Sequence, residues 1–394
     1  MMGATIGAPL SRVLGANDRI SVGIIGAGGR GTFDMHAVAE ANAANVAVTA
    51  ICDVWRPNRE RAAAWAAETF KVQPRQTTDY RELLTWRDVD AVVITTPDFG
   101  HATILKAAVE AGKDVYCEKP FAIDFAKGKA AYLAVKNSGR VVQVGSQRRS
   151  DGMHMAAAKL VRAGALGKIT RIEIDVAFQQ QRWARNYKDV KESDVAWKEF
   201  LMDLPPRPFD PRLLRQWQLF RATSNGVPGL WMCHFVDTVH WFMDDPYPAG
   251  AVSSGGVYLW KDGRQTSDVF QALIDYPKEF LFSFSMVLTN AGGDRNVWFG
   301  TRGTLEGSIE DQAEFRVSGN GSAATDRIAK ETRLDPEPTT THMENFLQCV
   351  RNRRTPRADY QAGFSHAVAC CMAAQAFETG RRVRFDRERI EIVT

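Results

Sequence analysis

The sequence lacks any apolar run close to the roughly 20 residues that a membrane-spanning helix needs. It holds only six cysteines, which form neither a Cys-x-x-Cys pair nor a zinc-ligand spacing, so we expect no disulfide framework. It also lacks long blocks of like charge, because 50 basic and 46 acidic residues are interspersed and give a net charge of +4. We therefore expect neither nucleic acid nor a membrane as a partner.

The 394-residue chain is instead typical of a two-domain globular protein, with 45% hydrophobic and 24% charged residues. Residues 1–17 are small and apolar but have no basic leader, so we interpret them as a leader remnant or a disordered arm. The chain as given is predicted to be cytoplasmic, whereas a signal segment upstream of it would make the protein periplasmic.

A glycine-rich turn is the most informative motif of the chain. An apolar run that begins at Ile20 leads directly into it. Glycines at this spacing let the backbone turn sharply, let a pyrophosphate approach, and point the amino end of the following helix at the phosphate. The turn predicts a dinucleotide site formed by Gly26, Gly28, Gly29, Arg30 and Gly31.

An acidic residue, Asp53, ends the second apolar run of the chain. A carboxylate about 20 residues after the glycine turn accepts hydrogen bonds from the ribose 2′-hydroxyl and repels a 2′-phosphate. Asp53 therefore favours NAD over NADP as the cofactor. Arg56 is the counter-argument, because it lies close enough in sequence to reach a phosphate.

Strand and helix patterns alternate through the first 148 residues. Repeated units of this kind predict a doubly wound parallel sheet covered by helices on both faces, the Rossmann arrangement, which binds ligands at the carboxyl ends of its strands. Buried strands are predicted within residues 20–25, 46–53, 90–97, 114–120 and 140–145, and helix caps at Asn58, Asp79 and Asp124.

The pattern changes in the second half of the chain. From about residue 168, strand-like runs separated by turns predict an α/β domain with a large, open, mostly antiparallel sheet, and helices are expected at 342–351 and 360–379. An irregular excursion at 178–222 is of the kind that usually carries function. The predicted divisions are an NAD-binding domain at 18–148, a substrate and oligomerisation domain at 149–380, and a C-terminal segment at 381–394.

Glu118, Lys119 and Pro120 stand at the predicted carboxyl end of a strand, beside the cofactor. A lysine there can hydrogen-bond a sugar hydroxyl and stabilise the negative charge that develops on an oxygen losing hydride. A surface ion pair between Glu118 and Lys119 is the alternative, but neighbouring side chains on a strand point to opposite faces. We therefore favour Lys119 as a catalytic residue.

His234, Asp237 and Trp241 share one face if the segment around them is helical. A neutral histidine can take a hydroxyl proton while hydride leaves for nicotinamide. A histidine among aromatic residues is also often a core residue, and we assign His240 to the core. His234 and Asp237 resemble two metal ligands, but no third ligand is spaced nearby, so we predict no metal site.

Together these motifs resemble the Gfo/Idh/MocA family of sugar-oriented oxidoreductases, and most of all its exported bacterial members. The glycine turn, Thr96-Pro97-Asp98 with His101, Glu118-Lys119-Pro120 and the segment around His234 carry the resemblance. It implies a nucleotide domain and an open-sheet domain, the latter often used to form a homodimer or homotetramer. It also implies that Lys119 and His234 are the catalytic pair, and that Thr96, Pro97, His101 and Glu118 join the cofactor site.

One residue departs from the family pattern. Many family dehydrogenases carry an aspartate four residues before the histidine, where this chain has Leu230. Our first hypothesis is an NAD-dependent oxidoreductase acting on a hydroxyl of a sugar or glycoside. The departure keeps two alternatives open: a glycoside-cleaving enzyme that oxidises, eliminates and re-reduces with bound NAD, and a non-catalytic dinucleotide-binding sensor.

Aromatic and polar side chains near the predicted cleft indicate a carbohydrate substrate. Flat aromatic faces stack on the C–H faces of pyranose rings, and five such residues are candidates: Trp183, Tyr187, Trp197, Trp217 and Trp231. Any single one is explained equally well as a core residue. Arg149 and Arg182 could bind hydroxyls or an anionic group, and the substrate ligands we predict are Gln147, Arg148, Trp197, Trp231 and Asp237.

Overall fold

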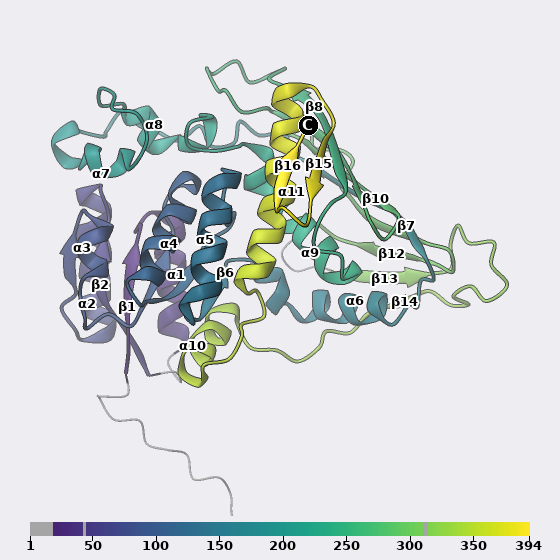
Figure 1. The fold of residues 1–394 in the computed structure, drawn as a ribbon, viewed down its shortest axis with the longest axis horizontal. Coiled ribbons are helices and arrows are strands. Elements are labelled where there is room, and N and C mark those ends of the chain that lie inside the picture. Colours follow the sequence, from purple (N-terminus) through teal and green to yellow (C-terminus); the bar gives the residue numbers. More distant parts are fainter. Residues whose placement is uncertain (1–18, 42–44, 310–313) are drawn as a thin grey trace, which may run out of the picture.

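The computed structural model of the protein describes residues 19–41, 45–309 and 314–394. The predicted leader remnant or disordered arm, residues 1–17, lies outside the described residues. Two sheets form the framework, with helices packed between and around them (Figure 1). In the described ranges, no helix is both long enough and apolar enough to cross a membrane.

The first sheet has six parallel strands in the order β3-β2-β1-β4-β5-β6, which confirms the predicted Rossmann arrangement. Its central strands are buried on both faces, as the continuous apolar runs predict. In chain order the strands are β1 (Ile20–Ile25), β2 (Val46–Cys52), β3 (Arg75–Thr77), β4 (Ala91–Ile94), β5 (Asp114–Cys117) and β6 (Val142–Val144).

Helices connect these strands, and two of the three predicted caps are confirmed. Asp79 accepts a hydrogen bond from the Arg81 amide, and Asp124 accepts one from the Lys127 amide. The helices are α1 (Gly29–Glu40), α2 (Arg56–Phe70), α3 (Tyr80–Leu84), the short 3₁₀ turn η3 (Asp98–Gly100), α4 (His101–Glu110) and α5 (Phe125–Ser138).

The cap predicted at Asn58 is wrong. Helix α2 begins at Arg56, and Trp55 stands at the capping position without a side-chain hydrogen bond to the helix. Proline is favoured in the first helical turn because its fixed φ matches the helix. Pro57 therefore starts the helix ahead of Asn58, which lies inside the first turn.

The second sheet has ten strands in the order β14-β13-β12-β11-β7-β10-β9-β8-β15-β16. Its pairings are antiparallel except for β7 with β10, so the prediction of a mostly antiparallel sheet is confirmed. The strands are β7 (Ile169–Ala177), β8 (Gly250–Gly256), β9 (Val269–Tyr276), β10 (Phe280–Val287), β11 (Arg295–Gly300), β12 (Thr304–Gly307), β13 (Phe315–Ser318), β14 (Thr332–Arg333), β15 (Val383–Asp386) and β16 (Glu391–Val393).

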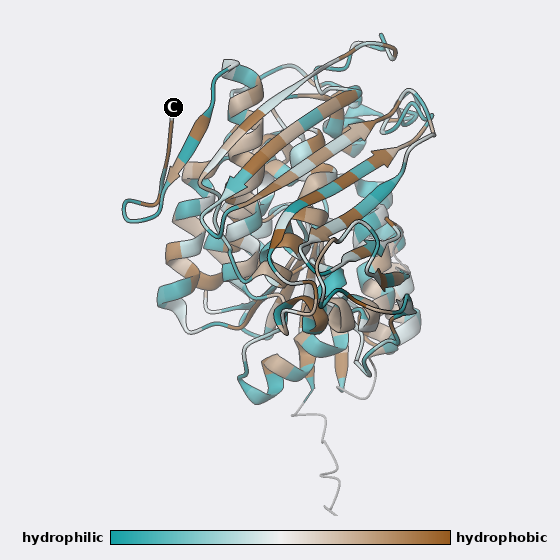
Figure 2. Ribbon diagram, turned by 90° about the vertical axis from the view of Figure 1, so that its right-hand side faces the viewer, coloured by the Kyte–Doolittle hydropathy of each residue, from teal (hydrophilic) through white to brown (hydrophobic). Residues whose placement is uncertain are grey.

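The two faces of this sheet differ in burial. Phe282 and Phe284 of β10 are fully buried beneath the helices, whereas the opposite face leaves Val252, Leu273 and Leu281 exposed. Figure 2 looks onto that open face, where hydrophobic and hydrophilic bands alternate along the strands. The helices on the inner face include α6 (Gly152–Arg162), α9 (Cys233–Met243) and α11 (Tyr360–Thr379).

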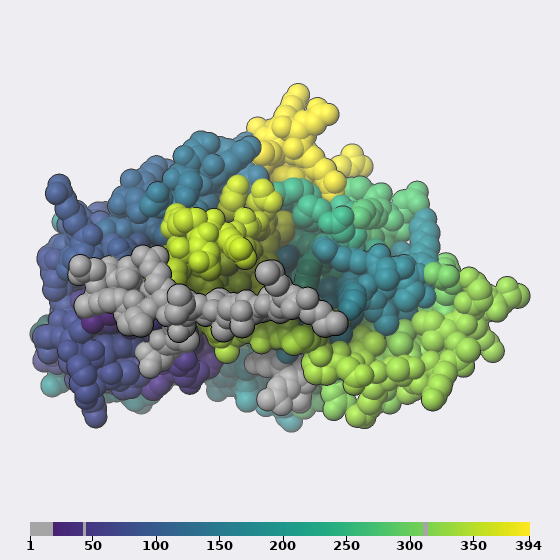
Figure 3. All heavy atoms as spheres, turned by 90° about the horizontal axis from the view of Figure 1, so that it is seen from below, coloured from purple at the N-terminus to yellow at the C-terminus, as the bar shows by residue number. Residues whose placement is uncertain are grey.

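Two C-terminal helices join the domains. Helix α10 (His342–Asn352) packs Phe346 and Leu347 into the core of the first sheet, and Figure 3 shows it on the surface between the two domains. Helix α11 stands between the two sheets in Figure 1. On it, buried Phe364 stacks on Tyr132 of α5, with ring centroids 4.5 Å apart, and also contacts Tyr247.

The excursion at 178–222 lies over the carboxyl end of the first sheet (Figure 1). The Ala196 amide donates to the Val54 carbonyl just after β2, and Phe200 packs on Phe99 just after β4. The excursion contains η5 (Glu192–Asp194), α7 (Trp197–Leu201), α8 (Pro211–Arg215) and η6 (Trp217–Leu219).

We predict that Phe364 is a main source of stability at the junction of the domains. Phe364→Ala should lower the free energy of unfolding by about 3–5 kcal/mol, because it removes a buried ring and leaves a cavity. Chemical denaturation would measure this loss. Phe33→Ala is the matched control, because Phe33 is 60% exposed, and a loss of similar size in both variants would contradict the assignment.

Candidate active site

Two glycines of the turn after β1 have no room for a side chain. Gly26 has a φ of +94°, and a Cβ added to it would lie 2.8 Å from the backbone of Thr95 and Thr96. A Cβ on Gly31 would lie 2.0 Å from the Gly26 carbonyl oxygen. Gly29, in contrast, faces open space. The turn therefore closes tightly on itself at Gly26 and Gly31, while α1 begins beside it.

The carboxylate of Asp53 ties the glycine turn to the next loop. One oxygen accepts the Ala27 amide at 2.6 Å, and the other accepts the Trp55 amide at 2.8 Å. Burial raises the pKa of Asp53, and these backbone hydrogen bonds oppose that shift. A carboxylate oxygen can accept more than one donor, so Asp53 keeps capacity for a ribose hydroxyl.

Glu118 is the centre of a buried polar cluster at the end of β5. Its Oε1 accepts hydrogen bonds from Arg30 Nη2 at 2.7 Å, from Gln147 Nε2 at 2.8 Å and from the Tyr116 hydroxyl at 3.3 Å. Arg30 also lies 3.3 Å from buried Asp34. The cluster brings together the predicted cofactor residues Arg30 and Glu118, and it engages Gln147, which we predicted as a substrate ligand.

Lys119 reaches from the first domain to the second. It is half-buried, and its Nζ donates a hydrogen bond of 3.2 Å to the backbone carbonyl of Leu230. Leu230 lies in a π-helical turn, η7 (Pro228–Met232), that leads into α9. π-Helical turns occur often at functional sites. An ammonium group has three N–H donors, and this contact uses one of them.

The peptide group that follows Pro120 is held by histidines from both domains. His101 Nδ1 lies 2.8 Å from the Pro120 carbonyl oxygen, and the Phe121 amide donates to His366 Nε2 at 3.2 Å. The peptide bond before Pro120 is cis. His101 also lies 2.8 Å from the Thr96 carbonyl, which joins the loop after β4 to the loop after β5. These contacts orient the backbone on which Lys119 stands.

His234 lies in the first turn of α9, one turn after Trp231. No hydrogen bond to its ring is present among the described residues, and the ring centroids of Trp231 and His234 are 6.5 Å apart. Burial holds the pKa of His234 well below its usual value, and the positive charges of Lys119 and Arg148 lower it further. The imidazole is therefore neutral at pH 7 and can accept a proton.

Asp237 faces away from any open space. It is 1% exposed, and Arg149 Nε donates to both of its oxygens, at 3.1 and 2.9 Å. This ion pair holds the pKa of Asp237 well below its usual range against the opposing effect of burial. His366 Nδ1 lies 3.9 Å away. The geometry leaves Asp237, a predicted substrate ligand, no exposed oxygen for a substrate, and gives it a role in joining α9 to the η4 turn (Gln147–Ser150).

The side chains of two other predicted substrate ligands are also engaged in contacts within the protein. Arg148 is 8% exposed, donates to the Ile309 carbonyl at 3.0 Å, and lies over the Phe235 ring. Trp197 stacks on Phe200 with centroids 5.0 Å apart, in the apolar cluster that anchors the excursion. Trp231 is the predicted aromatic ligand that lies beside His234.

Asp98 is a residue to which sequence reasoning gave no role. It is 3% exposed, and one of its oxygens is buried without a hydrogen-bond partner. Burial raises the pKa of Asp98 to about 7, while the positive charge of Lys119 opposes that shift. The sequence did carry a signal for Asp98, because it is a charged residue just after β4. Ligands bind at the carboxyl ends of the strands in sheets of this kind.

Within the described ranges, no group of three or more His, Cys, Asp or Glu side chains is arranged to hold a metal ion. The cysteines at 52, 117, 233, 349, 370 and 371 are all free and buried. In this region, the positive charge of Lys119 acts on the titratable groups of both Asp98 and His234.

Family models match both domains of the chain. Residues 20–146 match the model described as the oxidoreductase family, NAD-binding Rossmann fold, and residues 158–385 match the C-terminal alpha/beta domain of the same oxidoreductase family. The two matches together cover the six-stranded sheet and the ten-stranded sheet up to residue 385, within β15.

Curated relatives include dehydrogenases of cyclic polyols. An inositol 2-dehydrogenase of Salmonella typhimurium is 32% identical over 150 residues, which is 38% of this chain and 43% of that protein. The chain thus spans less than half the length of that relative. The scyllo-inositol 2-dehydrogenase (NAD(+)) of Bacillus subtilis is 27% identical over 323 residues, covering 79% of this chain and 82% of that protein.

Solved structures share the whole fold at low identity. The aldose-aldose oxidoreductase of Caulobacter crescentus, complexed with glycerol, has a TM-score of 0.72 at 18% identity, covering 93% of this chain and 100% of that one. A levoglucosan dehydrogenase in complex with NADH and levoglucosan has a TM-score of 0.70 at 19% identity, covering 93% and 99%. At this identity the likeness shows the fold alone.

We predict that the glycine turn tolerates a methyl group at one position and not at another. Gly31→Ala should weaken NADH binding by roughly 10-fold or more, because the new Cβ would collide with the Gly26 carbonyl. Gly29→Ala is the matched control and should bind NADH like the unaltered protein. Fluorescence titration with NADH measures both, and equal weakening in the two variants would argue against this turn as the binding site.

The raised pKa of Asp98 predicts a pH-dependent stability. The folded protein holds this proton more tightly than the unfolded chain, so the contribution of Asp98 is full below the unfolded pKa, near 4, and is lost as pH rises towards 7. Asp98→Asn cannot lose the proton, so its unfolding free energy should rise relative to the unaltered protein by at most about 1.4 kcal/mol per pH unit across that window. Denaturant unfolding at pH 5 and pH 7 measures it, with Asp88→Asn, exposed on the surface, as the control. A constant difference would contradict the assignment.

Proposed function

The chain belongs to the Gfo/Idh/MocA oxidoreductase family, and on that premise we propose that it is an NAD-dependent oxidoreductase acting on a hydroxyl of a sugar or glycoside. The observation that carries the proposal is that Lys119 lies close enough to His234 for its positive charge to lower the pKa of that imidazole. Lys119 stands at the carboxyl end of a cofactor-domain strand, and its Nζ bonds the turn that leads into His234. Both residues thus approach the edge of the sheet where a dinucleotide binds.

The charges at this edge suit the removal of hydride from an alcohol. NAD, when bound, supplies the hydride acceptor. Neutral His234 accepts the hydroxyl proton at a ring nitrogen, and the ammonium of Lys119 donates a hydrogen bond to the oxygen as negative charge develops on it. In the reverse direction the same ring returns the proton. The low pKa of His234 keeps it ready as a base across the neutral range.

The surroundings of Asp53 support NAD rather than NADP. Asp53 places a carboxylate beside the turn that would receive the adenosine ribose. Arg56, the residue that argued for a 2′-phosphate, donates to Asp194 at 2.5 Å and lies 3.7 Å from Glu60. Its charge is thus already balanced by two carboxylates.

Leu230 supports the glycoside-cleaving enzyme as a second candidate. Leu230 stands where the family pattern has an aspartate, and it offers Lys119 only a backbone carbonyl. Among the described residues, no carboxylate contacts the ring of His234. In that reaction, oxidation of a hydroxyl acidifies the neighbouring C–H. Loss of that proton and departure of the glycosidic oxygen leave an unsaturated ketone. Water then adds across its C=C bond, and the hydride returns to the carbonyl to give the free sugar. Release of sugar without net NADH identifies this candidate, whereas bound NAD without turnover identifies a sensor.

The open face of the ten-stranded sheet supports assembly into a homodimer or homotetramer. Exposed Val252, Leu273 and Leu281 lie on neighbouring strands β8, β9 and β10. Apolar side chains gathered on one sheet face favour a protein partner.

The test replaces the proposed catalytic residues. Lys119→Met and His234→Asn should each lower kcat by roughly 100-fold or more, because each removes a group that touches the reacting hydroxyl. Both should retain NADH binding, since neither contacts the glycine turn among the described residues. Lys106→Met is the control, because Lys106 pairs with Glu110 on the exposed face of α4. Full turnover in either active-site variant would overturn the assignment of that residue.

A further inference from the structure

Arg182 carries a positive charge that no acidic group in the described part of the chain balances. Its guanidinium lies over two aromatic rings, with Cζ 4.4 Å from the centroid of Phe178 and 4.8 Å from that of Trp231. It makes no ion pair or hydrogen bond through its side chain with any described residue, and its Nη1 is buried without a partner. Burial lowers the pKa of Arg182, and no neighbouring charge offsets this effect. A desolvated cation without an anion costs free energy.

The other arginines around the proposed site already have partners. Arg149 donates to both oxygens of Asp237, Arg30 donates to Glu118, and Arg148 donates to the Ile309 carbonyl. Of the arginines that the sequence indicates as substrate ligands, Arg148, Arg149 and Arg182, only Arg182 has a guanidinium that donates to no protein acceptor in the described ranges.

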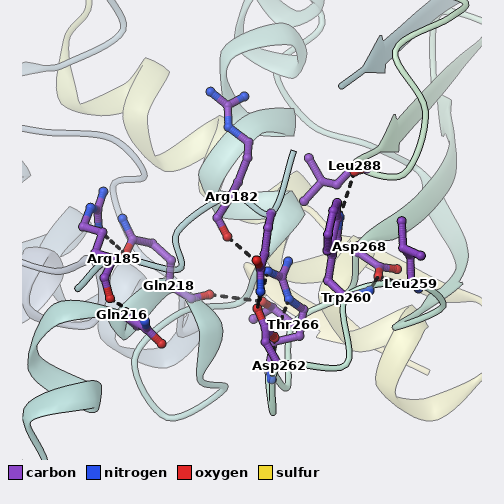
Figure 4. Close-up of polar contacts among 12 residues, drawn as sticks. Arg182, Arg185, Gln216, Gln218, Leu259, Trp260, Asp262, Thr266, Asp268 and Leu288 are labelled. Carbon is purple, nitrogen blue, oxygen red and sulfur yellow. Dashed lines mark hydrogen bonds and ion pairs between the residues drawn. The ribbon is translucent and has the colours of Figure 1, made fainter. Parts of the chain in front are cut away.

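The backbone of Arg182 is held firmly although its side chain is not. Arg264 Nη2 donates to the Arg182 carbonyl at 3.2 Å, and the same guanidinium pairs with Asp262 through two hydrogen bonds of 2.8 and 2.9 Å. Arg264 is wholly buried at its side chain. Figure 4 shows the Arg182 carbonyl turned towards this pair while its side chain extends away from it. The backbone that carries this guanidinium is therefore fixed before any ligand arrives.

The wider network in Figure 4 joins the start of the excursion to its later part, and the Thr266 hydroxyl, just before β9, donates to the Gln218 carbonyl of that later part. Gln216 Nε2 donates to the Arg185 carbonyl at 2.6 Å, and Arg185 donates to Gln218. Asp268 accepts the amides of the loop at 258–260, and Trp260 Nε1 donates to the Leu288 carbonyl. A charged side chain on a segment held in this way is suited to recognition.

Trp231 connects Arg182 with the proposed chemistry. Its ring lies under the Arg182 guanidinium and 6.5 Å, between centroids, from the ring of His234. A pyranose held beside Trp231 would thus have a hydroxyl near His234 and a substituent near Arg182, since both of these groups pack against that one ring.

We propose that Arg182 binds a carboxylate of the substrate, so that this site takes an acidic sugar of the hexuronate class or its glycoside. The inference rests on the proposed function, because it names the substrate of that same site. A single planar guanidinium offers two parallel N–H donors, which match the two oxygens of a carboxylate. A phosphate dianion is less suited, since no lysine or second unpaired arginine accompanies Arg182 in the described ranges.

The test compares acidic and neutral sugars on the full chain with NAD bound. The panel pairs glucuronate with glucose, galacturonate with galactose, and the methyl glycosides of each, with glucose 6-phosphate as a separate arm. Isothermal titration measures binding, and absorbance of NADH measures turnover. We expect at least one hexuronate to bind roughly 10-fold or more tightly than its neutral partner, with a preference that weakens as salt is added.

Substitutions then assign the preference to Arg182. Arg182→Met should lose the preference for the acidic sugar and leave the affinity for the neutral sugar nearly unchanged. Arg182→Lys should keep part of it, because a point charge remains without the fork. Arg75→Met is the matched control, since Arg75 also lies over a tryptophan, 3.8 Å from the Trp86 centroid, at the β3 edge of the first sheet.

Each result separates the inference from the proposed function. Neutral sugars that bind and turn over as well as hexuronates overturn the inference and leave the oxidoreductase in place. A preference that survives Arg182→Met, or tighter binding of glucose 6-phosphate than of any hexuronate, also overturns it. Hexuronate binding that depends on Arg182, without formation of NADH or release of sugar, supports the inference and removes the proposed function. If Arg182→Met unfolds, Arg182→Lys decides by the same comparison.

Discussion

The relative placement of the two domains depends on hydrogen bonds to one segment, Glu118–Phe121. Each of its polar groups is held by a different part of the chain: Glu118 by Arg30, Lys119 by the Leu230 carbonyl, and the next peptide by His101 and His366. Two of these partners belong to the nucleotide domain and two to the domain of the ten-stranded sheet. A buried peptide group without partners would cost free energy, so the satisfied arrangement keeps the domains in register.

This arrangement of the domains places the neutral imidazole of His234 near three positively charged side chains. His234 lies in a region where Lys119, Arg148 and Arg30 all disfavour its protonation. Asp237, the acidic residue one turn further along α9, is occupied by Arg149 and does not offset them. The imidazole of His234 therefore has no hydrogen-bond partner among the described residues. The ammonium of Lys119 uses one of its three donors for the Leu230 carbonyl. This separation of roles is what acid–base chemistry on an alcohol requires.

Much of the fold could be predicted from local patterns, and the exceptions have local causes. Asp79 and Asp124 cap helices as expected, because a capping side chain bonds an amide only two or three residues away. Asn58 does not, because Pro57 starts the helix earlier. For the site, position within a strand–helix unit indicated Lys119 and the glycine turn. It did not indicate that Gln147 faces Glu118, or that His366, 245 residues away, holds the Phe121 amide.

Short segments of the chain were enough to predict the classes of structure and of cofactor. Buried runs and glycines predicted a Rossmann sheet, and alternating runs predicted a mostly antiparallel sheet. These features are properties of short segments, governed by backbone sterics and the burial of one face. Which charges remain unbalanced, in contrast, depends on how the folded chain packs. Of the arginines near the site, packing paired Arg149 with Asp237 and left Arg182 over Trp231, with no acceptor for its guanidinium among the residues that the structure describes. Charge pairing depends on which distant segments meet, and spacing along the chain does not contain that information.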